Sequence, residues 1–176
     1  MFIVRPATPN DASGIARVHI ESWKTTYQGI MPDSVIDNLD NTFERRKAHW
    51  EQVATDGENI IFVAEQGEDI VGFVSGGDVQ DEVEGYDLEL YTLYLLASAQ
   101  GQGIGKALFD ALAKTAHEQG YKSLILWVLD ANNSKGFYEH LGGERVAEGI
   151  WQARDKQLKK LAYGWASLSA LVSKKS

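Results

Sequence analysis

The chain has 176 residues, of which 44% are hydrophobic and 24% charged, and this suits one globular domain spanning residues 1–176. It contains no cysteine, so disulfides, thiolate zinc sites and a cysteine nucleophile are excluded. The formal net charge of −8 disfavours nucleic acid as a partner. No apolar run is long enough to span a membrane, and the first residues do not resemble an export signal. We therefore expect a cytoplasmic protein that binds neither nucleic acid nor membrane.

The first part of the chain predicts an edge strand followed by helices. Residues 2–8 (FIVRPAT) alternate in polarity and contain a proline, which is typical of a short edge strand. Residues 25–33 (TTYQGIMPD) indicate a turn-rich break. Helices are expected at three places: from a cap at Asn10 or Asp11 through Ser22, after a cap at Asp33, and from Thr42 to about Ala54.

The middle of the chain predicts two hairpins. Residues 59–66 and 69–80 are expected to be strands joined by a turn at Gly67. A second hairpin leads into a strand at residues 88–96 (LELYTLYLL). Its acidic tip, residues 78–87, is interpreted as a solvated loop in preference to a cation site.

The second half predicts alternating helices and strands. An amphipathic helix is expected to carry one apolar stripe and to stop at Gly120; the stripe is Ile104, Leu108, Leu112 and Ala116. Residues 123–129 (SLILWVL) are typical of a strand buried on both faces. A short helix from Asn132 or Asn133 to near Gly142 and two final strands follow. This order predicts an α/β protein of the α+β mixed-sheet type, with helices on both faces of the sheet.

Three alternate glycines separate the strand 88–96 from the amphipathic helix. Gly101, Gly103 and Gly105 leave the backbone N–H groups bare where the helix begins. The first-turn N–H groups of a helix have no intrahelical partner, and the helix dipole adds roughly half a positive charge there. The turn therefore predicts a binding site for a phosphorylated ligand.

Two common phosphate motifs do not fit this turn. A P-loop needs four residues between its glycines and a Ser or Thr after the lysine, whereas Ala107 follows Lys106 here. The dinucleotide fingerprint needs a glycine at the position that Lys106 occupies.

The run Gln100-Gly101-Gln102-Gly103-Ile104-Gly105 instead resembles motif A of the GNAT superfamily of N-acetyltransferases, in which this loop holds the pyrophosphate of coenzyme A. Residues 126–144 (LWVLDANNSKGFYEHLGGE) resemble motif B of the same family, in the right order and at the usual separation. The resemblance covers nearly the whole chain and implies a mixed, mostly antiparallel, seven-stranded sheet flanked by helices. The chain departs from many members by having Ala97-Ser98-Ala99 where a proline is common, and this removes no donor.

The resemblance implies acetyl-CoA as co-substrate and no metal. The implied cofactor-binding residues are Leu93, Tyr94, Leu95, Gln100, Gly101, Gln102, Gly103, Ile104, Gly105, Lys106 and Asn132. Leu93 and Leu95 are expected to act through their backbone groups, since the fourth strand of the family splays from the fifth and pairs with pantetheine. Asn132 contacts the pantetheine arm or simply caps a helix, and Lys106 contacts a phosphate or is a solvated helix residue.

Amide formation from a thioester needs a neutral amine and a protonated leaving thiol. By resemblance, Tyr138 is the candidate general acid; the alternative is a buried aromatic residue with a satisfied hydroxyl. Glu89 is the candidate base, with Glu21 as a second candidate and an exposed strand acid as the alternative reading of Glu89. Period-two geometry predicts that Glu89 shares one strand face with Tyr91, Leu93 and Leu95.

The acceptor is expected on the opposite side of the sheet, under the first helices. Glu21, Trp23 and Tyr27 are the candidate substrate-binding residues, although core packing explains Trp23 equally well. The four histidines show no metal-ligand spacing, so no metal site is expected.

The sequence therefore predicts an acetyl-CoA-dependent N-acetyltransferase that acts on a primary amine by direct attack in a ternary complex. The alternatives are a catalytically silent CoA-binding module and a transferase for a longer acyl group. The acceptor, a small-molecule or peptide amine, is left open, and a homodimer through the last strands is compatible with this fold.

Overall fold

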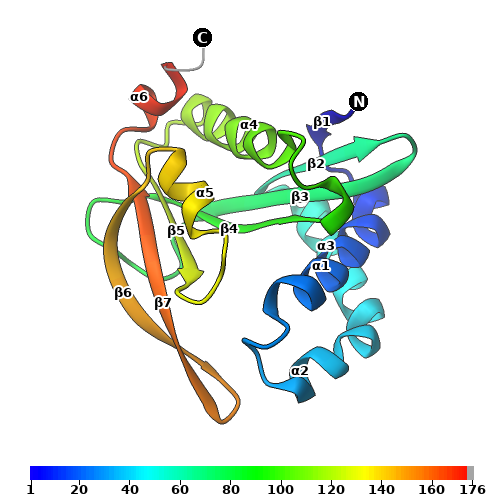
Figure 1. Ribbon diagram of the computed structural model, residues 1–176. Helices are drawn as coiled ribbons and strands as arrows, with labels where there is room; N and C mark the ends of the chain where they lie inside the picture. The colour runs from blue at the N-terminus through cyan, green and yellow to red at the C-terminus, as the bar shows by residue number, and fades with distance from the viewer. Residues whose placement is uncertain (174–176) are drawn as a thin grey trace.

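The computed structural model describes residues 1–173 and contains one seven-stranded sheet with the order β1-β2-β3-β4-β5-β7-β6 (Figure 1). The strands are β1 (Ile3–Pro6), β2 (Ile60–Gln66), β3 (Asp69–Asp78), β4 (Leu88–Leu95), β5 (Leu124–Leu129), β6 (Glu144–Ala153) and β7 (Lys156–Trp165). Only β4 and β5 are parallel among these neighbours. The expected mixed, mostly antiparallel sheet is therefore confirmed.

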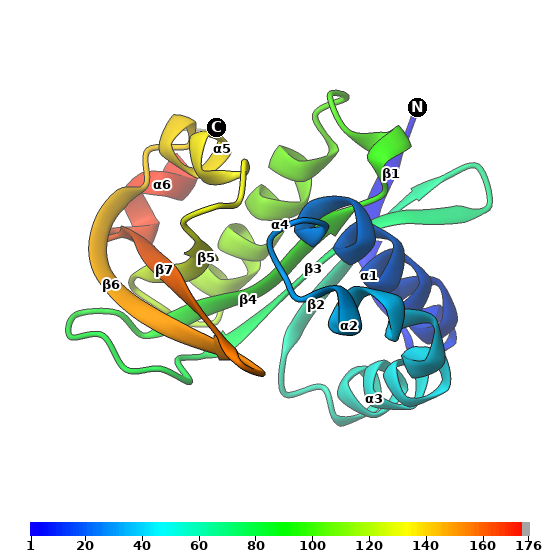
Figure 2. The same cartoon turned by 60° about the horizontal axis from the view of Figure 1, so that its bottom comes forward.

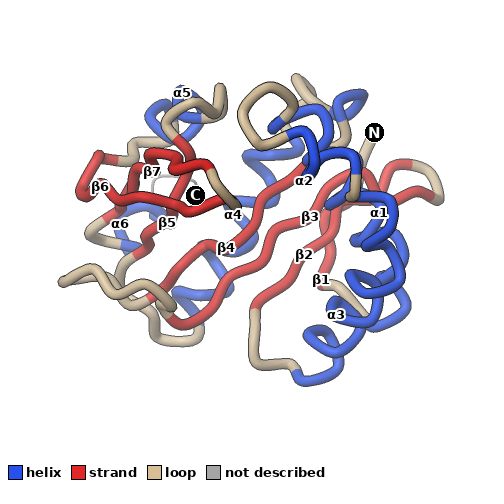
Figure 3. Tube along the Cα trace, turned by 90° about the horizontal axis from the view of Figure 1, so that it is seen from below, coloured by secondary structure: helices blue, strands red, loops and turns tan. Residues whose placement is uncertain are grey.

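Helices cover both faces of the sheet (Figures 1 and 3). One face carries α4 (Ile104–Glu118), α5 (Lys135–His140) and α6 (Leu168–Ser173), which share an apolar cluster with the strands. The other face carries α1 (Ala12–Tyr27) and α3 (Phe43–Asp56), and α2 (Asp33–Asp37) lies between these two helices along the chain. Short 3-10 turns occupy Pro9–Asp11, Leu39–Thr42 and Ala97–Ala99.

The predicted stripe of α4 is confirmed as its buried face. Ile104, Leu108, Leu112 and Ala116 are each at most 1% exposed and pack into the larger apolar cluster. Gly120 follows the helix with a φ of +95°, which is the left-handed conformation expected after a helix end.

Helix α1 is longer than the sequence indicates. It continues through the predicted break to Tyr27. Within the helix, the Thr25 hydroxyl donates a hydrogen bond to the Ser22 carbonyl at 3.1 Å. Asp11 precedes α1 but makes no side-chain cap; its carboxylate instead pairs with Arg5, at 2.8 Å. Tyr27, at the end of the helix, packs in a cluster with Met31 and Leu129, and this packing outweighs the weak helix propensity of Thr25 and Thr26.

Strand β4 contains a bulge at Tyr91. Thr92 pairs with Ser75 and Leu90 pairs with Gly76, so Tyr91 is an extra residue in the β3–β4 ladder. A bulge shifts the alternation of side chains by one position. The prediction that Glu89 shares a face with Leu93 and Leu95 is therefore wrong.

The two halves of β4 keep their leucines on the α4 face because of this bulge. Leu90 pairs with Gly76, where an added Cβ would lie 3.1 Å from Leu112 of α4. Leu93 and Leu95 also pack in the cluster that contains α4. Glu89, Thr92 and Tyr94 accordingly face α1.

Pairing between β4 and β5 stops at the bulge. The parallel register covers only Leu88 to Leu90 on β4, opposite Leu124 to Leu126 on β5. Beyond this point β4 continues with β3 and β5 continues with β7. The expected separation of the fourth and fifth strands is present.

The β6–β7 hairpin extends beyond the sheet and approaches the turn after α1 (Figure 2). Lys156 donates a hydrogen bond to the Ile30 carbonyl at 2.8 Å, and Trp151 contacts Trp23 with ring centres 6.0 Å apart. Strand β6 is the edge of the sheet and exposes Ile150. A homodimer through this edge stays a prediction.

Candidate functional site

A cavity of about 650 Å³ opens where β4 and β5 separate. Its walls come from the C-terminal end of α1, the C-terminal part of β4, the glycine turn, β5 and the start of α5. The lining residues are 25–27, 90–95, 97, 100, 101, 103–106, 126–128, 132–134, 137 and 138. The predicted cofactor-binding residues fall on this wall, with the exception of Gln102.

The glycine turn forms one end of the cavity. Gly101 and Gly103 have φ values of +78° and +83°, a region that L-residues rarely adopt. An added Cβ at either position would meet no protein atom within 4 Å. The first backbone bond of α4 is donated by Ala107 to Gly103, at 3.1 Å, so the preceding N–H groups have no partner within the helix. The turn therefore presents backbone donors to an open space.

The side chains of Gln102 and Lys106 make polar contacts around this turn. Gln102 accepts a hydrogen bond from Gln66 at 2.9 Å and donates one to the Ser98 carbonyl at 3.1 Å. Lys106 lines the cavity and also forms an ion pair with Asp110, at 2.9 Å. The side chain of Gln102 thus ties the turn to β2.

The backbone of β4 presents unpaired groups to the gap. Leu96 donates its N–H to the Val71 carbonyl at 2.9 Å, so in the alternating antiparallel ladder the backbone groups of Tyr94 and Thr92 face β3. The groups of Leu93 and Leu95 then face the side where β5 has separated. This placement fits the expectation that these two leucines act through their backbone.

Tyr138 lies in the cavity wall opposite β4. It is 7% exposed, and its ring contacts Phe137 edge to face at 5.2 Å between centres. Burial raises the pKa of the Tyr138 hydroxyl, with a smaller contribution from Tyr27, so the phenol is protonated at neutral pH.

Tyr27, Tyr94 and Asn132 form a polar group in the same wall. Burial raises the pKa of Tyr27, while hydrogen bonds from Tyr94 and Asn132 act in the opposite direction. Burial also raises the pKa of Tyr94. The side-chain oxygen of Asn132 accepts the Ser134 N–H at 2.8 Å, which shapes the turn before α5. Asn132 thus shapes this turn and also lines the cavity.

Glu89 lies just outside the lining residues. It is 8% exposed, and its carboxylate accepts the N–H groups of Gln80, at 3.0 Å, and Asp81, at 3.4 Å. The side chains of Ser75 and Thr92, whose hydroxyl oxygens are 2.5 Å apart, follow on the same sheet face toward the cavity.

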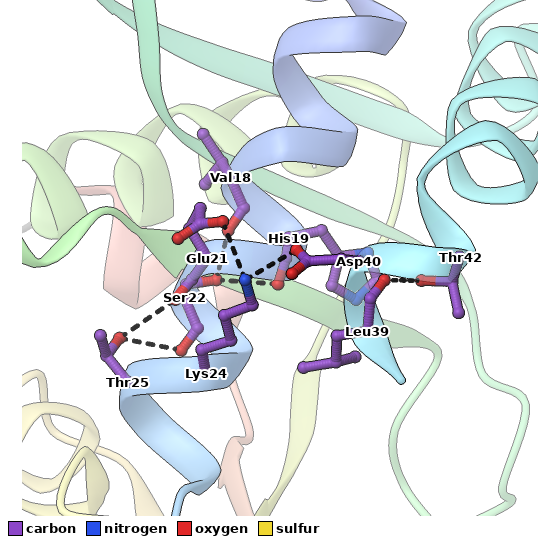
Figure 4. A network of polar contacts seen from close by, with 9 residues as sticks. All are labelled: Val18, His19, Glu21, Ser22, Lys24, Thr25, Leu39, Asp40 and Thr42. Carbon is purple, nitrogen blue, oxygen red and sulfur yellow. Dashed lines mark hydrogen bonds and ion pairs between the residues drawn. The ribbon is translucent and has the colours of Figure 1, made fainter. Parts of the chain in front are cut away.

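Glu21 and Trp23 also lie outside the lining residues. Lys24 pairs with Glu21 at 3.4 Å and with Asp40 at 2.7 Å, so Glu21 belongs to a surface network between α1 and the turn before α3 (Figure 4). Trp23 packs on Tyr27 with ring centres 4.6 Å apart. Of the three predicted substrate-binding residues, only Tyr27 reaches the cavity wall.

Several lining residues were not singled out from the sequence. Thr25 and Thr26 reach the wall because α1 is longer than expected, and Thr92 reaches it because the bulge turns it toward α1. In LELYTLYLL the leucines occupy even positions at first (88 and 90) and odd positions afterwards (93 and 95). This change in the alternation is the sequence signal that would have indicated the bulge.

Within residues 1–173, no group of three or more His, Asp or Glu side chains gathers as a metal site. The helices of this described part include none that is long and apolar enough to cross a membrane.

Comparison with known proteins gives the family. Residues 20–143 match the acetyltransferase (GNAT) family. N-acetyltransferase YuaI of Bacillus subtilis is 38% identical over 172 residues, covering 97% of this chain and 96% of that protein. The chain belongs to the GNAT family of N-acetyltransferases.

Solved structures share the fold. PaiA N-acetyltransferase from Thermoplasma acidophilum, in complex with coenzyme A, has a TM-score of 0.69 at 20% identity, covering 94% of this chain and 99% of that one. The yncA protein of Salmonella typhimurium, with acetyl-CoA, has a TM-score of 0.70 at 20% identity, covering 96% and 95%.

Proposed function

We propose that this protein transfers an acetyl group from acetyl-CoA to a primary amine by direct attack in a ternary complex. The observation that carries the proposal is the continuous cavity, which joins the glycine turn, the unpaired edge of β4 and Tyr138. The two structural neighbours that contain coenzyme A or acetyl-CoA support the choice of co-substrate.

The glycine turn would hold the pyrophosphate of coenzyme A. Its free N–H groups and the dipole of α4 attract phosphate oxygens, and the bare glycines let them approach closely. The pantetheine arm would then run along the gap and pair with the backbone groups of Leu93 and Leu95 as an added strand. Asn132 lies beside this path.

The chemical step forms a C–N bond and breaks a C–S bond. The amine nitrogen attacks the thioester carbonyl carbon, and a backbone N–H of β4 stabilises the developing oxyanion. When the C–S bond breaks, the Tyr138 hydroxyl donates to the departing sulfur and is reprotonated from solvent. The raised pKa of Tyr138 keeps this donor protonated before the reaction.

Glu89 is the proposed acceptor of the amine proton. An amine with a pKa near 10.4 costs about 4–5 kcal/mol to deprotonate at pH 7, so a base lowers the barrier. Glu89, Thr92 and Tyr94 follow one another on the α1 face of β4. Thr92 lines the cavity and its hydroxyl pairs with that of Ser75, so the amine proton would pass to Glu89 by way of this side of the strand.

Two measurements test the proposal. Isothermal titration with coenzyme A measures binding, and thiol release from acetyl-CoA across a panel of amines measures transfer. Binding together with amine-dependent thiol release is the expected result. Tight binding without thiol release with any amine would indicate a silent CoA-binding module, and release only from longer acyl-CoA would indicate a different acyl group. A protein that does not bind coenzyme A would refute the assignment of the cavity.

A further inference from the structure

His19, on the α1 face of the sheet, has a hydrogen-bond donor at each ring nitrogen. Trp50 Nε1 lies 3.3 Å from His19 Nδ1, and Arg46 Nη1 lies 3.4 Å from His19 Nε2. Indole and guanidinium N–H groups only donate, and a neutral imidazole accepts at one nitrogen, so only one of these two contacts can be a hydrogen bond; we assign it to the shorter contact, from Trp50, which makes Nδ1 the accepting nitrogen. This hydrogen-bond network assigns the ring proton to Nε2 in the neutral imidazole.

Burial supports the neutral state of this ring. It lowers the pKa of His19 to about 3, with Arg46 and His49 acting in the same direction. The Nε2–H group therefore points at the Arg46 guanidinium, which also has donors only. Two donors face each other, and an acceptor placed beside them would satisfy both.

Arg46 is held in position without a counter-ion. Its Nε donates to the Thr42 hydroxyl at 2.8 Å. Thr42 in turn donates to the Leu39 carbonyl at 2.6 Å, as Figure 4 shows. Burial lowers the pKa of Arg46, and no ion pair involves its guanidinium among residues 1–173. A half-buried cation without an anion is costly, so the site favours an anionic partner.

The nearby carboxylates are already engaged. Figure 4 shows Lys24 between Glu21 and Asp40, with distances of 3.4 Å and 2.7 Å. These two acids therefore do not neutralise Arg46, although they lie on the same part of the surface.

This pair of donors lies next to the cavity wall. The His19 ring stacks on Tyr94 with centres 5.3 Å apart and planes 18° apart. The Arg46 guanidinium lies 6.0 Å from the centre of the Trp23 ring, and Trp23 packs on Tyr27. Both Tyr94 and Tyr27 line the cavity, on the side away from α4.

We propose that Arg46 and His19 bind a carboxylate of the acceptor, so that the acceptor is an amine that also carries a carboxylate, as amino acids and peptides do. This inference rests on the proposed acetyl transfer. One carboxylate oxygen would accept from an Arg46 N–H and the other from His19 Nε2–H, next to the face of Trp23. A single negative charge matches the one uncompensated guanidinium, which favours a carboxylate over a doubly charged phosphate.

The first test compares acceptors that differ only in this group. Glycine, β-alanine, γ-aminobutyrate and ε-aminocaproate are each paired with the corresponding carboxamide, and kcat/KM with acetyl-CoA is measured. At least one pair is expected to favour the carboxylate tenfold or more. Arg46→Gln should remove the preference, and the matched control Arg45→Gln, on an exposed neighbour of the same helix, should keep it. A preference that survives in Arg46→Gln would overturn the proposal.

The second test needs no turnover. In ¹H–¹⁵N NMR spectra, His19 should show the Nε2–H tautomer, and acetate should shift this resonance while acetamide should not. Arg46→Gln should remove the acetate response, and a melting curve checks that this variant is folded. An Nδ1–H tautomer, or equal responses to acetate and acetamide, would refute the anion site. Failure of the proposed function is distinguishable, since it shows as absent CoA binding or absent thiol release with every amine.

Discussion

The substitution Gly103→Ala separates the backbone role of this glycine from its role in leaving space for a ligand. Gly103 has a φ of +83°, and an L-residue in the left-handed region costs about 1–2 kcal/mol. No protein atom lies within 4 Å of the added Cβ, so there is no internal clash to add. For a domain of this size the melting temperature should fall by about 2–4 °C per kcal/mol.

The same Cβ would project into the proposed phosphate site. We expect the affinity for coenzyme A to fall at least tenfold, or about 1.4 kcal/mol, measured by isothermal titration. Gly120→Ala is the matched control, because Gly120 has a φ of +95°, also has no atom within 4 Å and lies at the opposite end of α4. The control should lose comparable stability and keep its CoA affinity. If Gly103→Ala binds coenzyme A as tightly as the control does, the turn is not the phosphate site.

Three further predictions concern the acid, the base and the partly buried His19. Tyr138→Phe should lower turnover by about 10²-fold or more at unchanged CoA affinity, and an unchanged rate would remove Tyr138 from the mechanism. Glu89→Gln should lower turnover at pH 7, and this loss should shrink at higher pH, where the amine deprotonates without a base. The melting temperature of this variant should stay unchanged, since the amide oxygen still accepts the Gln80 and Asp81 N–H groups. A low-pH loss of stability is expected from His19, because the unfolded ring binds a proton below about pH 6.5 whereas the folded ring does so only near pH 3. At pH 5.5 this loss is about 1.4 kcal/mol of the free energy of unfolding. In urea unfolding, His19→Phe should therefore lose less stability between pH 7.5 and pH 5.5 than the wild type does. Equal losses in the two proteins would contradict the neutral state of the folded His19 ring.

The parts of the fold that follow from local pattern were predictable from the sequence. The apolar stripe of α4, the turn at Gly67 and the buried run at residues 123–129 each involve neighbours within one element or one hairpin. The glycine turn was predictable for the same reason, since positive φ and a free helix N-terminus are local properties.

Other features depend on contacts between distant segments. Counting alternate residues along β4 gives the wrong face for Leu93 and Leu95, because the sequence carries only a shift in leucine spacing and the pairing with β3 is what makes Tyr91 a bulge. The length of α1 depends on packing of Tyr27 against Met31 and Leu129. Arg46 resembles any solvated helix arginine until the fold shows that Lys24 engages the neighbouring acids.

The bulge in β4 has a consequence for variants that change the length of the chain. Without Tyr91 the strand would read Leu-Glu-Leu-Thr-Leu-Tyr-Leu, a strict alternation that keeps every leucine on the α4 side. Such a deletion mutant should fold with a straighter strand that continues to pair with β5, and it should no longer bind coenzyme A in a titration. One surplus amino acid in an otherwise regular strand would then be the difference between a closed sheet and an enzyme.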